Sequence, residues 1–420
     1  MRFLLITTVF QPYNSLGAIR VGKFAKYLLN RGHEVKVLAA KNPSTLSTLP
    51  MDIPEECVTY TGWLNVNFLP EMVFGGQKKV VQQGYGTGLT GLKRLGLFYR
   101  ILFHFPDQYI GWLPQAVRVG RKVIRDFKPD LIYASAMPFT SLMVASILGR
   151  QYHIPWVGEL RDLWTENMNY SFPEWRREAD AWLERRTLHS AKALVTVSDS
   201  FADKLREKYS QPVAVIMNGF DPNDYPLPCE LLTPNPDILR IVYTGAVYPN
   251  FQDPSPLFEA LQQMGAAANS VRIVFYTRYS DLIESQAAKY GVSHLVEIHG
   301  LVPYRQSLKT QKEADICLLL LWNNPAERGV LPAKLFEYLG ARRPILAVGA
   351  VQNPAAVIVC EREAGFFSND PAAIARKIAG WQEQKLIEGA IPFLSEESNK
   401  GLSRQEQYTK LEEFLLSLNC

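Results

Sequence analysis

ERGVLPAKLFEYLG, residues 327–340, is the stretch of this chain that decides its fold. The apolar segment 315–322 precedes it, and a second apolar segment, 344–348, follows it. Two short β-like runs that flank one helical repeat predict the order strand, loop, helix, strand. The helical spacing predicts a buried stripe of Leu335, Phe336 and Leu339. The opposite face then carries Lys334, Glu337, Tyr338 and Ala341.

The start of this predicted helix is a candidate anion site. Gly329, Val330 and Leu331 precede the first turn, where backbone N–H groups without helical partners can bind a phosphate or pyrophosphate. Lys334 would add a positive charge beside that anion, and Glu337 would accept hydrogen bonds from sugar hydroxyls. The alternative is an ordinary amphipathic helix in which both charged side chains are simply solvated.

The same order of elements recurs on both sides of a proline-rich linker. Five prolines fall between residues 222 and 236. β-like runs begin near residues 2, 34, 130, 155, 193 and 213 before the linker, and near 239, 271, 295, 315 and 344 after it. Strand-first α/β units form doubly wound sheets that bind ligands outside the carboxyl ends of their strands. We therefore predict two Rossmann-like domains, 1–222 and 223–401, facing each other across a cleft.

The composition indicates a globular protein and limits its partners and its cellular compartment. The chain has 420 residues, 47% of them apolar and 20% charged, with a net charge of +4, which indicates a globular protein without a nucleic-acid partner. Five scattered cysteines without a C-x-x-C pair favour free thiols in a reducing compartment. Residues 1–10 lack a small-residue cleavage site and are interpreted as a first strand. No apolar run approaches the roughly 20 residues that span a bilayer, so we expect a cytoplasmic protein.

Several catalytic chemistries leave motifs that this sequence lacks. It has no H-E-x-x-H or clustered Cys and His for zinc, no G-x-S-x-G, no P-loop and no D-x-D. We therefore expect no metal and no cofactor. The one G-x-G-x-x-G match, residues 86–91, follows no convincing strand and is interpreted as a flexible loop.

Two features of the first half are candidate substrate contacts. Gly17, at the start of the first predicted helix, would allow a ligand to approach the backbone closely. Glu159, Arg161 and Asp162 lie at the carboxyl end of a predicted strand, a usual position for substrate contacts. The alternative for these three charged residues is a structural ion pair.

A basic segment suggests a further partner. Between residues 76 and 128 there are 10 Lys and Arg against two Asp, and aromatic residues are frequent from residue 60 onward. Residues 60–128 could rest on anionic lipid headgroups at the inner face of the cell membrane, or hold a lipid-linked phosphate. The alternative is a solvated helix face made of Arg118, Arg121, Lys122 and Arg125.

The segment GVLPAKLFEYLGARRPILA, residues 329–347, resembles the donor site of bacterial family-4 retaining glycosyltransferases, which have the two-Rossmann architecture GT-B. The tetrad at residues 218–221, Asn-Gly-Phe-Asp, is similar to the one that precedes the second domain in that family. The resemblance extends over nearly the whole chain. It implies an acceptor-binding first domain, a donor-binding second domain, and a final helix, about 402–420, that packs back on the first domain.

The resemblance also implies roles for single residues. Gly17 would be a donor-binding residue, in the loop that faces the donor pyrophosphate and the acceptor. Gly245 would let the donor phosphates come near, Val302 would contact the nucleobase, and Glu337 would bind the ribose hydroxyls. The loop containing Asp162 would lie near the acceptor or the catalytic pocket.

Two departures from the family pattern bear on the donor site. The first glutamate of the E-x7-E pattern falls on Gly329, so Glu327 is the nearby candidate for the donor-sugar hydroxyls. The usual Arg and Lys after Gly245 are absent, which leaves Lys334 or Arg278 to neutralise the pyrophosphate.

We therefore predict a retaining, metal-independent glycosyltransferase of cell-surface polysaccharide or glycan biosynthesis, with Lys334, Glu327 and Asp162 as catalytic candidates. The donor would be a UDP- or GDP-linked sugar, and the acceptor a glycan, a lipid-linked or a small-molecule hydroxyl. Two alternatives stay open. One is a nucleotide-sugar epimerase of the same fold, and the other is a non-catalytic protein that binds nucleotide sugars or glycans.

Overall fold

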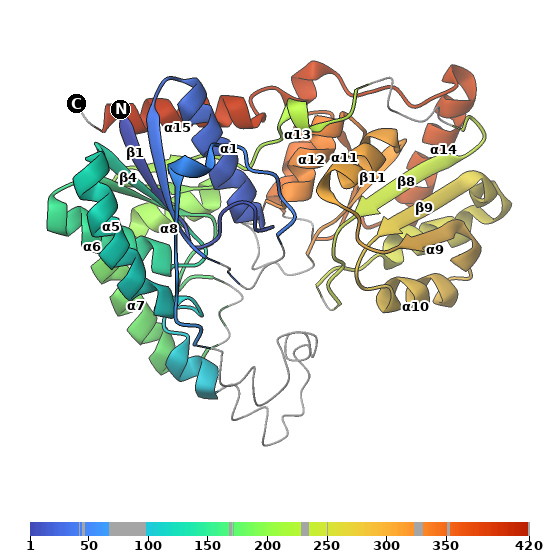
Figure 1. Cartoon of the computed structure of the whole chain (residues 1–420). Helices are drawn as coiled ribbons and strands as arrows, with labels where there is room; N and C mark the ends of the chain where they lie inside the picture. The colour runs from blue at the N-terminus through green and yellow to red at the C-terminus, as the bar shows by residue number, and fades with distance from the viewer. Residues whose placement is uncertain are drawn as a thin grey trace. The chain divides into compact units, whose positions relative to one another are not determined.

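The structure is a computed structural model, and Figure 1 shows its course. The chain divides into two compact units: unit 1 is Met1–Ile216 with Lys410–Cys420, and unit 2 is Met217–Thr409. The residues described below are 1–41, 43, 47–66, 98–167, 170, 172–227, 235–249, 251–322, 331–350 and 353–418.

Unit 1 contains a parallel sheet of seven strands in the order β3-β2-β1-β4-β5-β6-β7. β4 and β5 are buried at every position, so the sheet is covered on both faces, as expected for a doubly wound fold. The strands are β1 (Arg2–Ile6), β2 (Glu34–Ala40), β3 (Val58–Thr61), β4 (Leu131–Ala136), β5 (Trp156–Leu160), β6 (Ala193–Thr196) and β7 (Val213–Val215). The helices are α1 (Leu16–Asn30), α5 (Leu113–Phe127), α6 (Thr140–Tyr152), α7 (Glu174–Leu188) and α8 (Asp199–Lys208).

Unit 2 contains a parallel sheet of six strands in the order β10-β9-β8-β11-β12-β13. Successive residues of β8 enter two different apolar clusters, Ile241 on one face and Val242 on the other, because strand side chains alternate. The strands are β8 (Leu239–Thr244), β9 (Val271–Tyr276), β10 (Val296–His299), β11 (Ile316–Leu320), β12 (Ile345–Val348) and β13 (Gly365–Phe367). The helices are α9 (Ser255–Met264), α10 (Asp281–Lys289), α11 (Tyr304–Glu313), α12 (Ala333–Ala341), α13 (Pro354–Glu361), α14 (Pro371–Glu388) and α15 (Arg404–Ser417).

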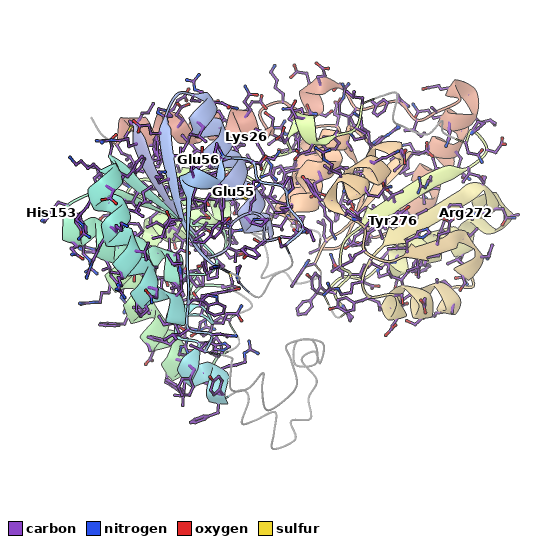
Figure 2. All side chains as sticks on the ribbon, in the orientation of Figure 1. Lys26, Glu55, Glu56, His153, Arg272 and Tyr276 are labelled. Carbon is purple, nitrogen blue, oxygen red and sulfur yellow. The ribbon has the colours of Figure 1, made fainter. Side chains whose placement is uncertain are left out.

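Each sheet has one place where its strand order reverses, between β1 and β4 in unit 1 and between β8 and β11 in unit 2. The helices that follow the strands on the two sides of such a point leave the sheet on opposite faces, which opens a crevice at the carboxyl ends of the strands. Arg272 and Tyr276, labelled in Figure 2, lie near the start and at the end of β9. Because the strands are parallel, the edge of the unit 2 sheet at Tyr276 is its carboxyl edge. These two edges are where ligands are expected.

The final residues of the chain are tied to unit 1 by one buried carboxylate. Glu412 accepts hydrogen bonds from Tyr27 Oη at 2.7 Å and Arg31 Nε at 3.1 Å, and it pairs with His33 Nε2 at 2.8 Å. Tyr27 belongs to the last turn of α1, Arg31 directly follows this helix, and His33 immediately precedes β2. The unit boundary therefore falls within α15, between residues 409 and 410.

The predicted two-domain α/β architecture is confirmed, and the predicted strands and helices lie within a few residues of the observed ones. The stripe formed by Leu335, Phe336 and Leu339 is fully buried as expected. The prediction was wrong for Tyr338 and Ala341, which are also fully buried. Tyr338 satisfies its hydroxyl inside the core by accepting a hydrogen bond from the Thr244 amide at 3.3 Å. The interpreted loop at 86–91 lies outside the described residues.

Candidate functional site

Gly245 and Lys334 lie in contact at the carboxyl edge of the unit 2 sheet. Gly245 directly follows β8, and Lys334 is in the first turn of α12, which follows β11, so the pair marks the crevice between these two strands. A Cβ atom at Gly245 would lie 2.7 Å from Lys334 Cε and 3.1 Å from its Nζ. The backbone at Gly245 also has φ +109°, which favours glycine. Two residues that the sequence indicated separately therefore form one site.

The Lys334 ammonium is held against Tyr243. Its Nζ donates to Tyr243 Oη and to the Ala246 carbonyl at 3.4 Å, and it lies 3.9 Å from the centroid of the Tyr243 ring. Burial lowers the pKa of Lys334 to about 7, although the nearby Glu337 carboxylate acts in the opposite direction. Lys334 is thus a cation whose charge depends on pH near neutrality and which a bound anion would stabilise.

Glu337 lies one turn further along α12 and is positioned by Gln311 of α11. Gln311 Nε2 donates to Glu337 Oε2 at 2.9 Å and also contacts Thr244 Oγ1 at 2.9 Å and Ser307 Oγ at 3.2 Å. Burial raises the pKa of Glu337, opposed by this hydrogen bond and by the charge of Lys334. The residue as a whole is half-buried.

Gln311 is a site residue that the sequence reasoning missed. It is completely buried, yet it belongs to a polar helix segment in which glutamine normally faces solvent. Its spacing of four residues from Ser307 is the only local signal, and that spacing is common on any helix.

The other donor-site candidates of unit 2 differ in their surroundings. Arg278 is exposed and lies two residues beyond β9, at the same edge as Gly245. Val302 is half-buried in the loop that leads into α11. The side chain of Leu331 packs in the apolar core, so only its backbone can face a ligand. Glu327, Gly329 and Val330 lie outside the described residues.

Arg161 and Gly17 form the corresponding contact in unit 1. Arg161 follows β5 and reaches the end of β4, where Nε donates to the Ala136 carbonyl at 2.7 Å and Nη2 to the Met137 carbonyl at 2.9 Å. A Cβ atom at Gly17 would lie only 2.6 Å from Arg161 Nη2. A side chain at this position would therefore displace the Arg161 guanidinium from its place beside α1.

Glu159 is part of a buried structural ion pair. Its Oε1 accepts from Arg20 Nε at 2.8 Å, its Oε2 accepts from Ser135 Oγ, and both charged side chains are at most 4% exposed. Burial alone raises the pKa of Glu159, but the guanidinium groups of Arg20 and Arg161 hold it below its usual value. Its oxygens are thus occupied by protein groups. The ion-pair alternative accounts for Glu159, with Arg20 as a partner that the sequence reasoning did not name.

Asp162 has a different environment from its neighbours. Its carboxylate is half-buried, and among the described residues no hydrogen bond or ion pair to it is found. Burial raises the pKa of Asp162, and the adjacent Arg161 lowers it in part. Asp162 therefore differs from Glu159 and Arg161, whose side chains are held by hydrogen bonds to other protein groups.

With this geometry in place, the chain can be compared with known proteins. Residues 17–219 match the family model of the glycosyl transferase 4-like domain. The match covers most of unit 1, including Gly17, Glu159, Arg161 and Asp162. No curated protein matches the sequence of the chain.

Solved structures extend the similarity to both units. The chain is similar to a sucrose-phosphate synthase from Thermosynechococcus elongatus, with 16% identity, a TM-score of 0.61, and coverage of 99% of this chain and 98% of the other. It is similar to the Anabaena protein HepE in complex with UDP-glucose, with 15% identity, coverage of 99% and 100%, and a TM-score of 0.61. It is also similar to a putative UDP-N-acetylglucosamine 2-epimerase from Listeria monocytogenes, with 12% identity, coverage of 99% and 96%, and a TM-score of 0.54.

These likenesses show that the chain has the GT-B fold of two Rossmann-like domains. The match to the glycosyl transferase 4-like domain is confined to residues 17–219. Among the described residues, no helix has the length and apolar character needed to cross a bilayer, and no group of His, Cys, Asp or Glu is arranged to hold a metal ion.

Proposed function

We propose that the protein is a retaining glycosyltransferase that moves a sugar from a nucleotide-diphosphate sugar to a hydroxyl of a glycan, a lipid-linked or a small-molecule acceptor. The observation that carries this proposal is the contact of Lys334 with Gly245 at the carboxyl edge of the unit 2 sheet. A glycine that admits a ligand to the backbone, beside a buried cation at a helix start, suits a diphosphate. Glu337, one turn further, suits sugar hydroxyls.

In the proposed reaction, the bond between the sugar anomeric carbon and the donor phosphate breaks as the acceptor oxygen bonds to that carbon on the same face. The acceptor proton passes to the departing phosphate oxygen. The charge that develops on the leaving diphosphate would be stabilised by Lys334 and by the backbone amides from Gly329 to Leu331. Arg278 is a second candidate cation for the diphosphate. Val302 is the proposed contact for the nucleobase.

The proposed acceptor side uses residues of unit 1. Asp162 has a carboxylate open to a substrate hydroxyl, and Arg161 is anchored so that the loop keeps its position. Glu327 remains the proposed contact for the donor-sugar hydroxyls. The proposed mechanism needs no protein nucleophile and no metal ion.

The structure of HepE with UDP-glucose favours a UDP-linked donor, with GDP-linked sugars as the second choice. The test is release of the nucleotide diphosphate from UDP- and GDP-sugars, with and without short glycan acceptors and with EDTA present. We expect acceptor-dependent release that Lys334→Ala lowers about 100-fold, the range of a single lost transition-state contact. If Lys334→Ala turns over the donor as fast as the original protein, Lys334 does not stabilise the leaving diphosphate. Nuclear magnetic resonance of the product would distinguish retention from inversion.

An epimerase is the second candidate, favoured by the likeness to the putative epimerase from Listeria monocytogenes. The two activities differ in their need for an acceptor. Conversion of a nucleotide sugar to its epimer without any acceptor would support the epimerase. Binding of nucleotide sugars without either reaction would support a non-catalytic protein.

Contact with a membrane surface at residues 60–128 is part of the proposal, as expected for a lipid-linked acceptor in glycan or polysaccharide biosynthesis. The helical residues 98–103 carry Phe98, Leu102 and Phe103, each about half exposed, at 58%, 48% and 52%. α5 adds an exposed basic face that includes Arg118 and Lys122. Exposed aromatic and basic side chains together suit anionic lipid headgroups. Co-sedimentation with anionic vesicles, weakened by Phe98→Ser/Phe103→Ser, tests this contact.

A further inference from the structure

A pocket with a volume of about 440 Å³ opens in unit 1 where α6, α7 and α8 end. Its charged and aromatic lining comes from all three helix ends, and it shares no residue with the candidate donor and acceptor positions. These lining residues are Arg150, Trp182, Arg185, Arg186, His189 and Lys208.

Three of the cations in this pocket have no carboxylate partner among the described residues. Arg185 and Arg186 are exposed and form no ion pair there, and Arg150 donates only to the Ser146 carbonyl of its own helix at 3.2 Å. Lys208 is different, because its Nζ lies 2.9 Å from Glu184 Oε1 and 3.6 Å from Glu166 Oε1. The three arginines therefore leave an excess of positive charge at the pocket.

The partial negative charges at the carboxyl ends of the helices do not neutralise this excess of positive charge. A helix carboxyl end has the effect of about half a negative charge, so the three ends that meet here offset about one and a half positive charges. Three unpaired guanidinium groups exceed that amount. Lys208 is paired with two carboxylates, Glu184 and Glu166, which remove one further unit of charge, so the pocket retains a net positive charge of about one half.

The base of the pocket is held in place by buried hydrogen bonds. The Glu184 carboxylate accepts from Tyr209 Oη at 3.0 Å and from the Thr165 amide at 3.2 Å, in addition to Lys208. These contacts join α7 to the end of α8. Above them, the Arg186 guanidinium carbon lies 5.6 Å from the Trp182 ring centroid, and this tryptophan is 56% exposed. The pocket combines a fixed base, exposed arginines and an accessible aromatic face.

We propose that this pocket binds a phosphate-bearing ligand. Arg150, Arg185 and Arg186 hold the phosphate oxygens, because the planar guanidinium group forms paired hydrogen bonds with phosphate. Trp182 packs against the organic group that carries the phosphate. The ligand is either a soluble phosphate compound or the headgroup of an anionic phospholipid.

The first test is calorimetric titration of the full chain with inorganic pyrophosphate. Arg185→Gln/Arg186→Gln should weaken binding at the pocket at least about tenfold, the loss of one charge-assisted contact. Arg305→Gln/Arg376→Gln, which removes the same charge from exposed positions of α11 and α14, should bind like the original protein. Pyrophosphate binding that is identical in both double variants would overturn the proposal. Thermal unfolding of each variant checks that the fold is retained.

Pyrophosphate would also occupy the proposed donor site, and Lys334→Ala separates the two. Loss of one site in Lys334→Ala and of the other in Arg185→Gln/Arg186→Gln supports both proposals. If only the arginine variant loses binding, the pocket stands and the donor-site assignment fails. If only Lys334→Ala loses binding, the pocket proposal fails. The arginines then only offset the partial negative charges at the helix carboxyl ends.

Co-sedimentation with vesicles distinguishes the two sources of phosphate. Binding to phosphatidylglycerol vesicles but not to phosphatidylcholine vesicles, weakened by Arg185→Gln/Arg186→Gln, supports a lipid headgroup. Pyrophosphate binding at the pocket, with vesicle binding that the substitutions leave unchanged, supports a soluble ligand. Absence of both effects overturns the proposal.

Discussion

Donor binding should weaken as the pH rises through neutrality, because the proposed diphosphate contact is the charged form of Lys334. Burial holds the pKa of this amine at about 7 in the free protein. The protonated form attracts the diphosphate, so affinity is present below this pKa and is lost above it. The protonated fraction falls from about three quarters at pH ~6.5 to about 3% at pH ~8.5, a roughly 25-fold change. That factor corresponds to about 1.9 kcal/mol of binding free energy.

The assay is calorimetric titration with UDP-glucose, whose diphosphate keeps its charge across this range, and with GDP-glucose as the second probe. Lys334→Arg is the matched control, since a guanidinium stays protonated at every pH tested. We expect the dissociation constant of the original protein to rise about 25-fold between the two pH values, and that of Lys334→Arg to stay nearly constant.

Two results would refute this reasoning. A pH-independent affinity in the original protein would mean that Lys334 does not carry the contact or is already charged throughout. An equal pH dependence in Lys334→Arg would assign the titration to another group.

Three further predictions concern single side chains. Glu337→Gln should raise the dissociation constant of the donor about tenfold, the value of a charge-assisted hydrogen bond, without lowering the thermal midpoint; unchanged affinity would exclude the proposed sugar contact. Gly17→Ala pushes a methyl group against Arg161 and should lower turnover by up to about 100-fold; full turnover would contradict this. Arg20→Met leaves the Glu159 carboxylate buried without its cation and should cost about 3–5 kcal/mol in urea unfolding, much of it recovered by adding Glu159→Gln. A loss below about 1 kcal/mol would mean that the pair is dispensable.

The α/β architecture could be predicted from the sequence because its signals are local. The fully apolar runs of β11 and β12 and the helical stripe of α12 identify each element from a few neighbouring residues. The elements from Pro354 to Glu388 were not resolved by the same reasoning. α13 and α14 are weakly amphipathic, since apolar residues surround much of each helix, and β13 is only three residues long.

The candidate site was predicted in part. Gly245, Lys334 and Glu337 were each indicated by a position after a strand or on a helix face, and the structure brings them together at one sheet edge. Gln311 could not be predicted, because a buried glutamine and a solvated one look alike in a polar helix. For the same reason, Glu159 could not be assigned to its ion pair with Arg20 from their positions in the chain.

The sequence by itself determined which segments form strands and helices and which of them end in glycine or charged residues. These properties depend on backbone preferences and on the periodicity of adjacent side chains. Only the tertiary structure decided which distant groups meet: Lys334 with Gly245, Glu159 with Arg20, and three helix ends around one cationic pocket. Such contacts depend on strand order, since the order of parallel strands sets which loop ends become neighbours.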